Sequence, residues 1–468
     1  MVIPPVVRAE ATLEAVSLLE SFVLGFSSAP DAWGTFRYIR SATKCRCLVR
    51  VRFGGVSTSY NFVQSRRAHL FLITVALIWG SGPNKFKDIV LTPTPKVIDR
   101  RFFGMHIHRS ADGTRWPKVP FGSWRLWDAR VTWADLQAAP KSWDFRRLDQ
   151  YVYLSQEHDV ELLLTLGMTP QWASSRPNVR VRGFEAYGPG AQAPPRQMEY
   201  WREYIRVVAT RYRGRIRFYE VWNEPDQPGF FSGTPQQMVA LSKAAYEILK
   251  SVDGNNIVVS PSVKCAQSGL VWLQEFLAAG GASYADVLGA HFYVMPLGPE
   301  AMVGQIDRVQ ALMRRYSIDK PLWNTEAGWG PPSSFCSEDE QATFVIRTFL
   351  LNAAAGIKRV YWYAWDNTNW VTLRLTDPVT GAPRPAAIAY AQLSQWLIGA
   401  RIEQCKTEGP DNWSCGIKGA DGEHWRILWS NAPTVPSKIT IETEKSSFPY
   451  TAGTDAEGLP LEVSGCPQ

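Results

Sequence analysis

From about residue 97 the chain repeats one arrangement: a short apolar run, a loop with Trp, Asn, Pro or His, and then an amphipathic helix. Such repeats are typical of parallel strands joined by helical crossovers. The eight apolar runs are 102–106, 124–126, 161–166, 217–222, 257–260, 287–292, 321–325 and 359–364. Eight units in roughly 300 residues predict a (β/α)8 barrel, placed at 88–399. A doubly wound sheet is the alternative, but no Gly-rich loop opens the first helix.

The helices have their own sequence signals. Thr234, Pro235 and Gln237 have the spacing of an N-cap, a first-turn proline and a capping-box partner, and Ser337 with Glu340 opens another helix in the same way. A third helix is predicted by an apolar face with a period of 3.6 residues, made of Met198, Trp201, Ile205, Val208, Ala209 and Tyr212.

After Trp396 the sequence changes to short runs in which apolar and polar residues alternate, separated by Gly, Pro and Asn. This pattern predicts a β-rich accessory domain at 400–468. The extended segment 88–97 has no helix after it, and we expect part of the domain to pair with it. Cys405 and Cys415 flank a turn, so they either close a disulfide across a hairpin or are two ordinary small side chains.

The first part of the chain differs in kind. Residues 1–62 show no sustained period of 3.6 or 2, and we interpret them as a doubtful leader. They are either a gene-model extension, with the true start near Val56 or Val63, or a real, poorly ordered leader whose following apolar stretch acts as a short anchor or a buried strand. Residues 63–82 contain Arg66 and Arg67, the apolar run 70–79 and a small-residue end, as in a secretory signal. The run is short for a membrane span of about 20 residues. Left uncleaved, the segment would tether the protein to the inner membrane.

Composition and charge narrow the function. The first 100 residues carry 13 Lys and Arg against 6 Asp and Glu, so the excess charge of +7 lies within them and the rest of the chain is balanced. The body therefore has no overall basic excess, and nucleic acid is not expected as a partner. The 20 Trp are unusually many, and indole faces pack large cores and stack on flat ligand faces.

Two carboxylates lie at the carboxyl ends of predicted strands, which is where barrels of this type carry their active sites. The fourth run ends in Asn223-Glu224-Pro225, and the seventh ends in Glu326, 102 residues after Glu224. Strands four and seven are nearly opposite, so their side chains can converge over the mouth.

Converging carboxylates suit glycoside hydrolysis. About 5 to 5.5 Å apart, one attacks the anomeric carbon while the other protonates the leaving oxygen, and the configuration is retained. At about 5 Å and an effective dielectric of about 20, two like charges repel by roughly 3 kcal/mol, or about two pKa units. We therefore expect one carboxyl to stay protonated near neutral pH.

At this point the sequence resembles the glycoside hydrolases of clan A. The resemblance rests on Asn-Glu-Pro at 223–225, on the Trp-x-Thr-Glu-x-Gly setting of Glu326, and on His291-x-Tyr293. Within the clan it is most similar to family 39, which includes β-xylosidases, α-L-iduronidases and bacterial exopolysaccharide endoglycosidases. The stretches 103–108 and 124–128 look especially like the Psl-type exopolysaccharide enzyme. The resemblance covers roughly residues 88–430.

The resemblance implies roles for individual residues. Glu224 would be the acid and base, Glu326 the nucleophile, Asn223 a donor to the hydroxyl beside the reacting carbon, and Tyr293 the partner that holds Glu326 ionised. The subsite for the sugar would be lined by His106, Arg125, His291 and Trp365.

Several of these residues have a plainer alternative. Trp172 and Trp365 either stack on sugar or are packing residues, and Arg125 is either a sugar ligand or an ion-pair partner of Asp128 or of a mouth carboxylate.

The rival chemistry is a metal-dependent barrel hydrolase. It would use His106 and His108 after strand one, with His291 and Asp366 in two further places. Strand five supplies no histidine, so this metal site would be short of ligands. A third alternative is a catalytically silent polysaccharide-binding protein. The presence of both carboxylates argues against it.

The sequence thus predicts an exported retaining β-glycosidase that needs no cofactor or metal. We expect the protein to be periplasmic, tethered to the membrane facing the periplasm, or secreted. Its substrate would be a polysaccharide or oligosaccharide. Loops rich in Gly and Pro at 172–195 and 328–337 suit an open cleft, and hence internal cleavage of a bacterial exopolysaccharide. An exo-acting β-xylosidase-like enzyme is the alternative.

Overall fold

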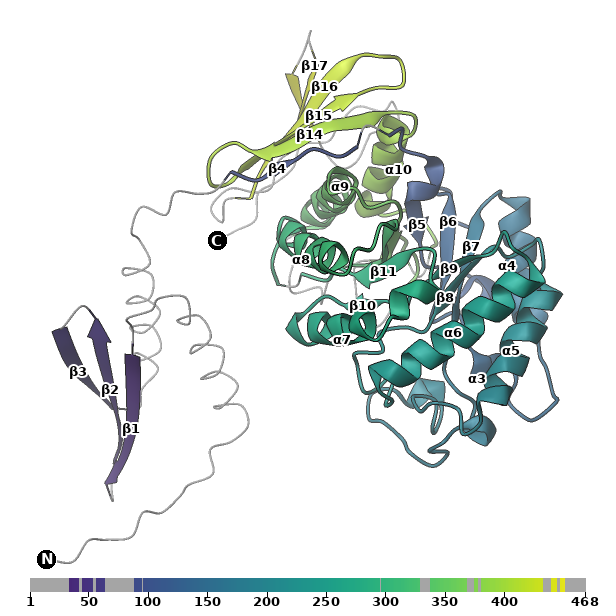
Figure 1. Ribbon diagram of the computed structural model, residues 1–468. Coiled ribbons are helices and arrows are strands. Elements are labelled where there is room, and N and C mark those ends of the chain that lie inside the picture. The colour runs from purple at the N-terminus through teal and green to yellow at the C-terminus, as the bar shows by residue number, and fades with distance from the viewer. Residues whose placement is uncertain are drawn as a thin grey trace, which may run out of the picture. The chain divides into compact units, whose positions relative to one another are not determined.

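The computed structural model divides the chain into two compact units, Met1–Phe86 and Lys87–Gln468 (Figure 1). The residues that it describes are 88–94, 96–294, 296–328, 337–367, 374–377, 380–431 and 439–443, together with the backbone of strands at 33–41, 44–53, 56–63 and 447–450. The apolar run at 70–79 lies outside them. No helix within this described part is long and apolar enough to cross a membrane.

The first unit contains an antiparallel sheet of β1 (Trp33–Ser41), β2 (Lys44–Phe53) and β3 (Val56–Val63), in that order. The expectation that residues 1–62 hold no regular pattern is therefore wrong. The signal was present but short, because residues 49–52 read Val-Arg-Val-Arg and alternate with the period of a strand.

The second unit is built around a parallel sheet in which every predicted apolar run forms a strand. The strands are β5 (Phe103–Met105), β6 (Ser123–Leu126), β7 (Glu161–Leu166), β8 (Phe218–Val221), β9 (Ile257–Val259), β10 (Val263–Lys264), β11 (Leu288–His291), β12 (Leu322–Ala327) and β13 (Val360–Trp362). Their order is β10-β11-β12-β13-β5-β6-β7-β8-β9.

The fifth barrel strand is split, and its halves close the sheet. β9 pairs with β8 and β10 pairs with β11, while only Ser260, Pro261 and Ser262 separate the halves. Proline cannot donate to a strand ladder, which explains the interruption. The Ser260 N–H donates to the Val287 carbonyl at 2.9 Å, so both halves join the same barrel and the predicted (β/α)8 fold is confirmed.

Helices alternate with these strands and surround them (Figure 1). They are α3 (Trp133–Leu136), α4 (Arg146–Glu157), α5 (Met198–Arg211), α6 (Pro235–Val252), α7 (Gln267–Ala278), α8 (Ala301–Arg315), α9 (Glu338–Ala354) and α10 (Pro385–Leu397). The predicted starts of α6 and α9 are confirmed, because Thr234 caps α6 in a full capping box and the Ser337 hydroxyl accepts the Glu340 N–H at 3.1 Å.

The barrel interior is layered, and the layers place the polar groups at one end. A buried apolar layer consists of Leu163, Phe218, Val259, Val287, Trp323 and Tyr361. Two residues further along their strands, Thr165, Glu220 and Thr325 face the same interior, because side chains alternate with a period of two. The apolar layer therefore closes the floor beneath a buried polar layer.

The accessory domain is an antiparallel sheet of β14 (Arg401–Thr407), β15 (Asn412–Lys418), β16 (His424–Ser430), β17 (Ile439–Thr443) and β18 (Ser447–Tyr450). As expected, β4 (Val90–Leu91) pairs with its edge at β14. Cys405 and Cys415 face each other in the hairpin register and form the disulfide. The Trp429 indole N–H donates to Glu300 Oε1 at 2.8 Å, which ties β16 to the start of α8.

The cap of α6 gives a stability prediction. The Thr234 hydroxyl accepts the Gln237 N–H at 3.2 Å, while Gln237 Oε1 accepts the Thr234 N–H at 2.9 Å. Thr234→Ala should lower the free energy of unfolding by about 1 kcal/mol, measured by urea denaturation, because the first helical turn loses its acceptor. Thr234→Ser keeps the hydroxyl and serves as the control. Equal unfolding midpoints for all three proteins would contradict this role of the cap.

Candidate active site

A cleft of about 1090 Å³ opens at the carboxyl ends of the barrel strands. Asn223, Glu224 and Glu326 all contribute to its lining, together with Lys264 from the fifth strand. The structure therefore brings the predicted catalytic pair to one cavity, at the end of the barrel where such folds carry their chemistry.

The two carboxylates lie close together. One oxygen of Glu224, one oxygen of Glu326 and one ring nitrogen of His291 all lie within 4.8 Å of one another. Retaining glycosidases hold their carboxyl groups about 5 to 5.5 Å apart, whereas inverting enzymes leave about 6.5 to 9.5 Å for a water. The observed spacing suits direct attack by one carboxylate rather than attack by a water between them.

The backbone after β8 turns sharply to present these side chains. Trp222 has φ +70° and Glu224 has φ +38°, both in the left-handed region that side chains rarely adopt. The Glu224 N–H donates to the Ser262 carbonyl at 2.9 Å, and Asn223 forms a parallel bridge with Ser262. Backbone strain is thus held in place by the neighbouring strand, as is common where function fixes a conformation.

Arg125 lies fully buried beneath the cleft and joins four strands. Its guanidinium donates to Glu220 Oε2 at 2.7 Å, Glu326 Oε2 at 2.8 Å and Asn223 Oδ1 at 2.7 Å. Its Nη1 also lies 3.0 Å from His106 Nε2. The side chain is 0% exposed, so it does not line the cleft as the sequence prediction placed it. Its pairing with mouth carboxylates matches the plainer alternative, and it orients the groups that do line the cleft.

Glu326 is held at both oxygens. The Tyr293 hydroxyl donates to Oε1 at 2.7 Å, while Oε2 accepts from Arg125. Burial raises the pKa of Glu326, and the positive charge of Arg125 and the Tyr293 hydroxyl act against that rise. Burial raises the pKa of Tyr293 well above its usual value, so its hydroxyl remains a neutral donor.

Glu224 has a different environment. Burial raises the pKa of Glu224 to about 7, with the charge of Lys264 acting in the opposite direction. Its Oε1 lies 2.9 Å from His291 Nδ1, and burial lowers the pKa of His291 to about 4, so this ring is neutral at pH 7. Burial thus raises the pKa of both carboxyls and is the main cause in each, whereas the sequence prediction had named repulsion between them.

Two groups that the rival metal site would need, His106 and Asp366, are engaged in other contacts. His106 Nδ1 lies 3.1 Å from the Trp362 carbonyl, which can only accept, so Nδ1 carries the proton and Nε2 faces Arg125. Asp366 accepts the backbone N–H groups of His108 and Arg109 and the Thr114 hydroxyl. These contacts engage two of the four groups that the rival metal arrangement would use.

Within the part of the chain that the structure describes, Glu224, His291 and Glu326 form a cluster whose ligand atoms are close enough to hold a metal. Both oxygens of Glu326 already accept hydrogen bonds, one of them from a guanidinium 2.8 Å away. A neighbouring positive charge disfavours a bound cation, so this cluster fits an acid and nucleophile pair better than a metal site.

The two predicted tryptophans do not lie in the cleft. Trp172 donates its indole N–H to the Gln137 carbonyl at 2.9 Å and packs edge-on against Trp133 and Tyr200. Trp365 is 2% exposed and faces a neighbouring pocket. These contacts agree with the alternative that Trp172 is a packing residue and does not stack on sugar.

Sequence reasoning missed the aromatic wall of the cleft. Trp127 stacks on Tyr187 with ring centroids 5.5 Å apart and meets Phe230 edge-on at the same distance. Tyr187 and Tyr363 both donate to the Asp128 carboxylate, which fixes the wall. Trp127 and Asp128 stood inside a stretch that carried the family resemblance, and that was the available signal.

Glu220 was also missed. It is fully buried and accepts from Arg125, from the Thr165 hydroxyl at 2.8 Å and from the Ser262 hydroxyl at 2.5 Å. A single carboxylate inside an otherwise apolar strand is expensive unless it is paired, and this was the signal in the sequence.

Comparisons with known proteins agree with this geometry. Residues 201–378 match the family model of a glycosyl hydrolase catalytic core, a span that includes Glu224 and Glu326. A curated β-xylosidase from Caldicellulosiruptor saccharolyticus is 28% identical over 219 residues, or 41% of this chain and 44% of that protein. The chain thus matches less than half the length of this relative.

Solved structures resemble the fold. A family 39 glycoside hydrolase from Bacteroides cellulosilyticus WH2 has a TM-score of 0.58 at 17% identity, covering 90% of this chain and 84% of that one. A family 39 β-xylosidase from Caulobacter crescentus has a TM-score of 0.51 at 18% identity, covering 69% and 79%. The expected likeness to glycoside hydrolases is confirmed, and the fold is like that of the two family 39 structures, while the closer likeness to the Psl-type enzyme stays a prediction.

The environment of Glu224 gives a measurable prediction. Lys264→Met should raise the pKa of Glu224 above about 7, because it removes a positive charge that favours the carboxylate. Lys264→Arg keeps the charge and is the matched control. Carbon NMR of the Glu224 carboxyl measures the titration directly. A Glu224 that titrates at the same pH in all three proteins would show that Lys264 does not act on it.

Proposed function

We propose that this relative of the family 39 glycoside hydrolases is a retaining glycosidase that cleaves β-linked sugars, with Glu224 as acid and base and Glu326 as nucleophile. The observation that carries the proposal is the close pair of carboxylates in unlike settings. One has a pKa of about 7, and the other lies 2.8 Å from a guanidinium.

In the first step Glu326 attacks the anomeric carbon while Glu224 gives its proton to the leaving oxygen, and a glycosyl ester forms on Glu326. A carboxyl with a pKa of about 7 is protonated in a large fraction of molecules near neutral pH and can still lose that proton. In the second step Glu224 takes a proton from water, which attacks the same carbon and releases Glu326.

Asn223 supports this chemistry through its fixed orientation. Its Oδ1 accepts from Arg125 at 2.7 Å, so the amide N–H groups are left to face the cleft. Such a donor suits the hydroxyl beside the reacting carbon, where hydrogen bonds strengthen in the transition state. His106, Arg125, His291 and Tyr293 then act as positioning groups beneath the reacting sugar.

The substrate is proposed to be a bacterial exopolysaccharide, cut internally. The cleft of about 1090 Å³ exceeds the roughly 300 to 1,000 Å³ of ordinary small-molecule sites, and its aromatic wall offers rings to a sugar chain. The Cys405–Cys415 disulfide favours an oxidising compartment, as does export. An exo-acting β-xylosidase is the second candidate, favoured by the names of two relatives.

Variants of the two carboxylates test their roles. Glu326→Gln should abolish turnover of all glycosides, because no ester can form. Glu224→Gln should lower kcat/KM by about 10²- to 10⁴-fold on substrates that need protonation, and spare dinitrophenyl glycosides, whose leaving group does not. Glu203→Gln, exposed on α5, is the control. Equal losses in both variants on both substrate types would remove the assignment.

The products separate internal from terminal cleavage. The chain from Lys87 onward, incubated with a panel of bacterial exopolysaccharides and with xylan, should release oligosaccharides with new reducing ends, followed by chromatography. The Glu326→Gln protein serves as the blank. Release of xylose alone would favour the exo-acting candidate instead, and polymer binding without any product would favour a silent binding protein.

A further inference from the structure

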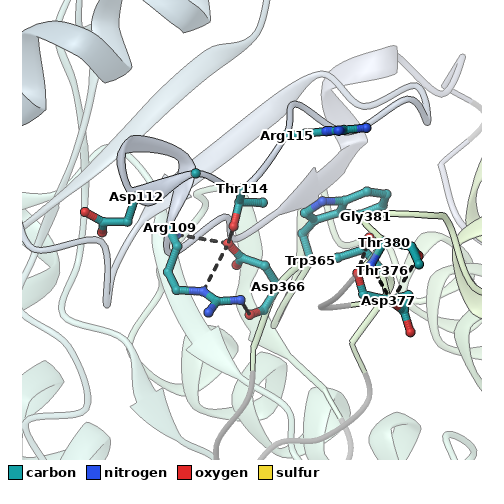
Figure 2. Close-up of a pocket in the computed structure, with 11 residues that line it drawn as sticks. Arg109, Asp112, Thr114, Arg115, Trp365, Asp366, Thr376, Asp377, Thr380 and Gly381 are labelled. Atoms are coloured by element: carbon teal, nitrogen blue, oxygen red, sulfur yellow. Dashed lines mark hydrogen bonds and ion pairs between the residues drawn. The ribbon is translucent and has the colours of Figure 1, made fainter.

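A second cavity, of about 340 Å³, adjoins the cleft. It lies between the loop after β5, which supplies Arg109, Thr114 and Arg115, and the segment after β13, which supplies Trp365 and Thr376. Figure 2 shows Arg109 and Thr114 bonded to Asp366 on one flank, with Trp365 and Thr376 across from them. We call these residues the glycone pocket.

We propose that the glycone pocket binds a neutral sugar unit of the substrate, next to the sugar that becomes attached to Glu326. The proposal rests on the proposed function. It assigns a separate binding site to a pocket that contains neither catalytic carboxylate.

The pocket and the cleft are neighbours. They share Arg109, Asp112 and Asp366 in their linings. Asp366 is 3% exposed and is fixed by the backbone N–H groups of His108 and Arg109, at 2.8 and 2.9 Å. A sugar chain held over the catalytic pair can therefore extend into the pocket past a rigid divider.

The barrel order sets the direction of that chain. The acid Glu224 follows β8, so the leaving sugar departs on that side of the mouth. The pocket lies over β13 and β5, separated from β8 by β6 and β7. β13 is instead the direct neighbour of β12, which carries Glu326. The pocket is thus on the side of the sugar that stays on the enzyme.

The charges of the pocket point to a neutral ligand. Two arginines and three aspartates line it, and Arg147, outside the lining, pairs with Asp112 at 2.8 Å, so the formal charges balance. The charged lining residues are Arg109, Arg115, Asp112, Asp366 and Asp377. An anion or a cation would upset this balance, whereas the hydroxyls of a sugar would not.

The free hydrogen-bonding groups are mainly donors. Both Asp112 oxygens accept from Arg147, and both Asp366 oxygens accept from backbone N–H groups of the loop after β5. Among the described residues Arg109 Nε has no hydrogen-bond partner, although Asp366 Oδ2 lies 4.0 Å away, and exposed Arg115 forms no hydrogen bond or ion pair. These guanidinium groups can donate to hydroxyl and ring oxygens, with an edge of the Trp365 indole beside them.

The test compares nitrophenyl β-glycosides of xylose, glucose and mannose with the matching nitrophenyl β-disaccharides. The wild-type protein should cleave at least one disaccharide glycoside at the nitrophenyl bond with higher kcat/KM than its monosaccharide. Arg115→Ala should lower that ratio about tenfold, the effect of one lost hydrogen bond to a charged group. Arg206→Ala, an exposed arginine on α5, is the matched control and should keep the ratio.

Equilibrium binding of xylobiose, cellobiose and mannobiose to the same proteins gives a readout without turnover. If no glycoside is cleaved but Arg115→Ala weakens disaccharide binding about tenfold relative to Arg206→Ala, the pocket stands and the proposed function fails. If monosaccharides and disaccharides are cleaved and bound alike, or if Arg115→Ala matches Arg206→Ala in both measurements, the glycone pocket is overturned.

Discussion

The site depends on one buried cation, the guanidinium of Arg125. A charge without water is costly unless it is paired and hydrogen-bonded, and an arginine cannot discard its charge by losing a proton. Here its planar donors reach Glu220, Glu326 and Asn223, so the cost is met by charged and polar acceptors from two further strands. Because those strands belong to a closed barrel, the same contacts that satisfy the cation also fix the geometry of the mouth.

The two carboxyls at the mouth have different partners because of this arrangement. Glu326 accepts hydrogen bonds from Arg125 and from the Tyr293 hydroxyl. Glu224 instead lies beside the neutral ring of His291. Both side chains are buried, and burial raises the pKa of both. The local partners are therefore what distinguishes the two carboxyls in the proposed mechanism, although repulsion between the pair was the cause expected from the sequence.

Rigid support extends outward from the site. Asp128 receives two tyrosine hydroxyls and steadies the aromatic wall, while Asp366 receives two backbone N–H groups and separates the cleft from the glycone pocket. Both carboxylates act on the shape of the cavity rather than on the bond that is broken. The proposed polymer substrate would need such fixed walls, because its position over the two carboxylates would be set by sugars away from the reacting carbon.

The sequence by itself determined the barrel, the starts of α6 and α9, and the strand ends that carry Glu224 and Glu326, because periodicity and capping are local properties of the chain. It offered only weak signals for β1 to β3, where the alternation is brief, and for Glu220. Only the tertiary structure decided that Arg125 and His106 lie beneath the cleft, that Trp172 packs against Trp133, and that Trp365 faces a separate pocket. Depth and direction depend on contacts between residues far apart in the chain, and no local pattern encodes them.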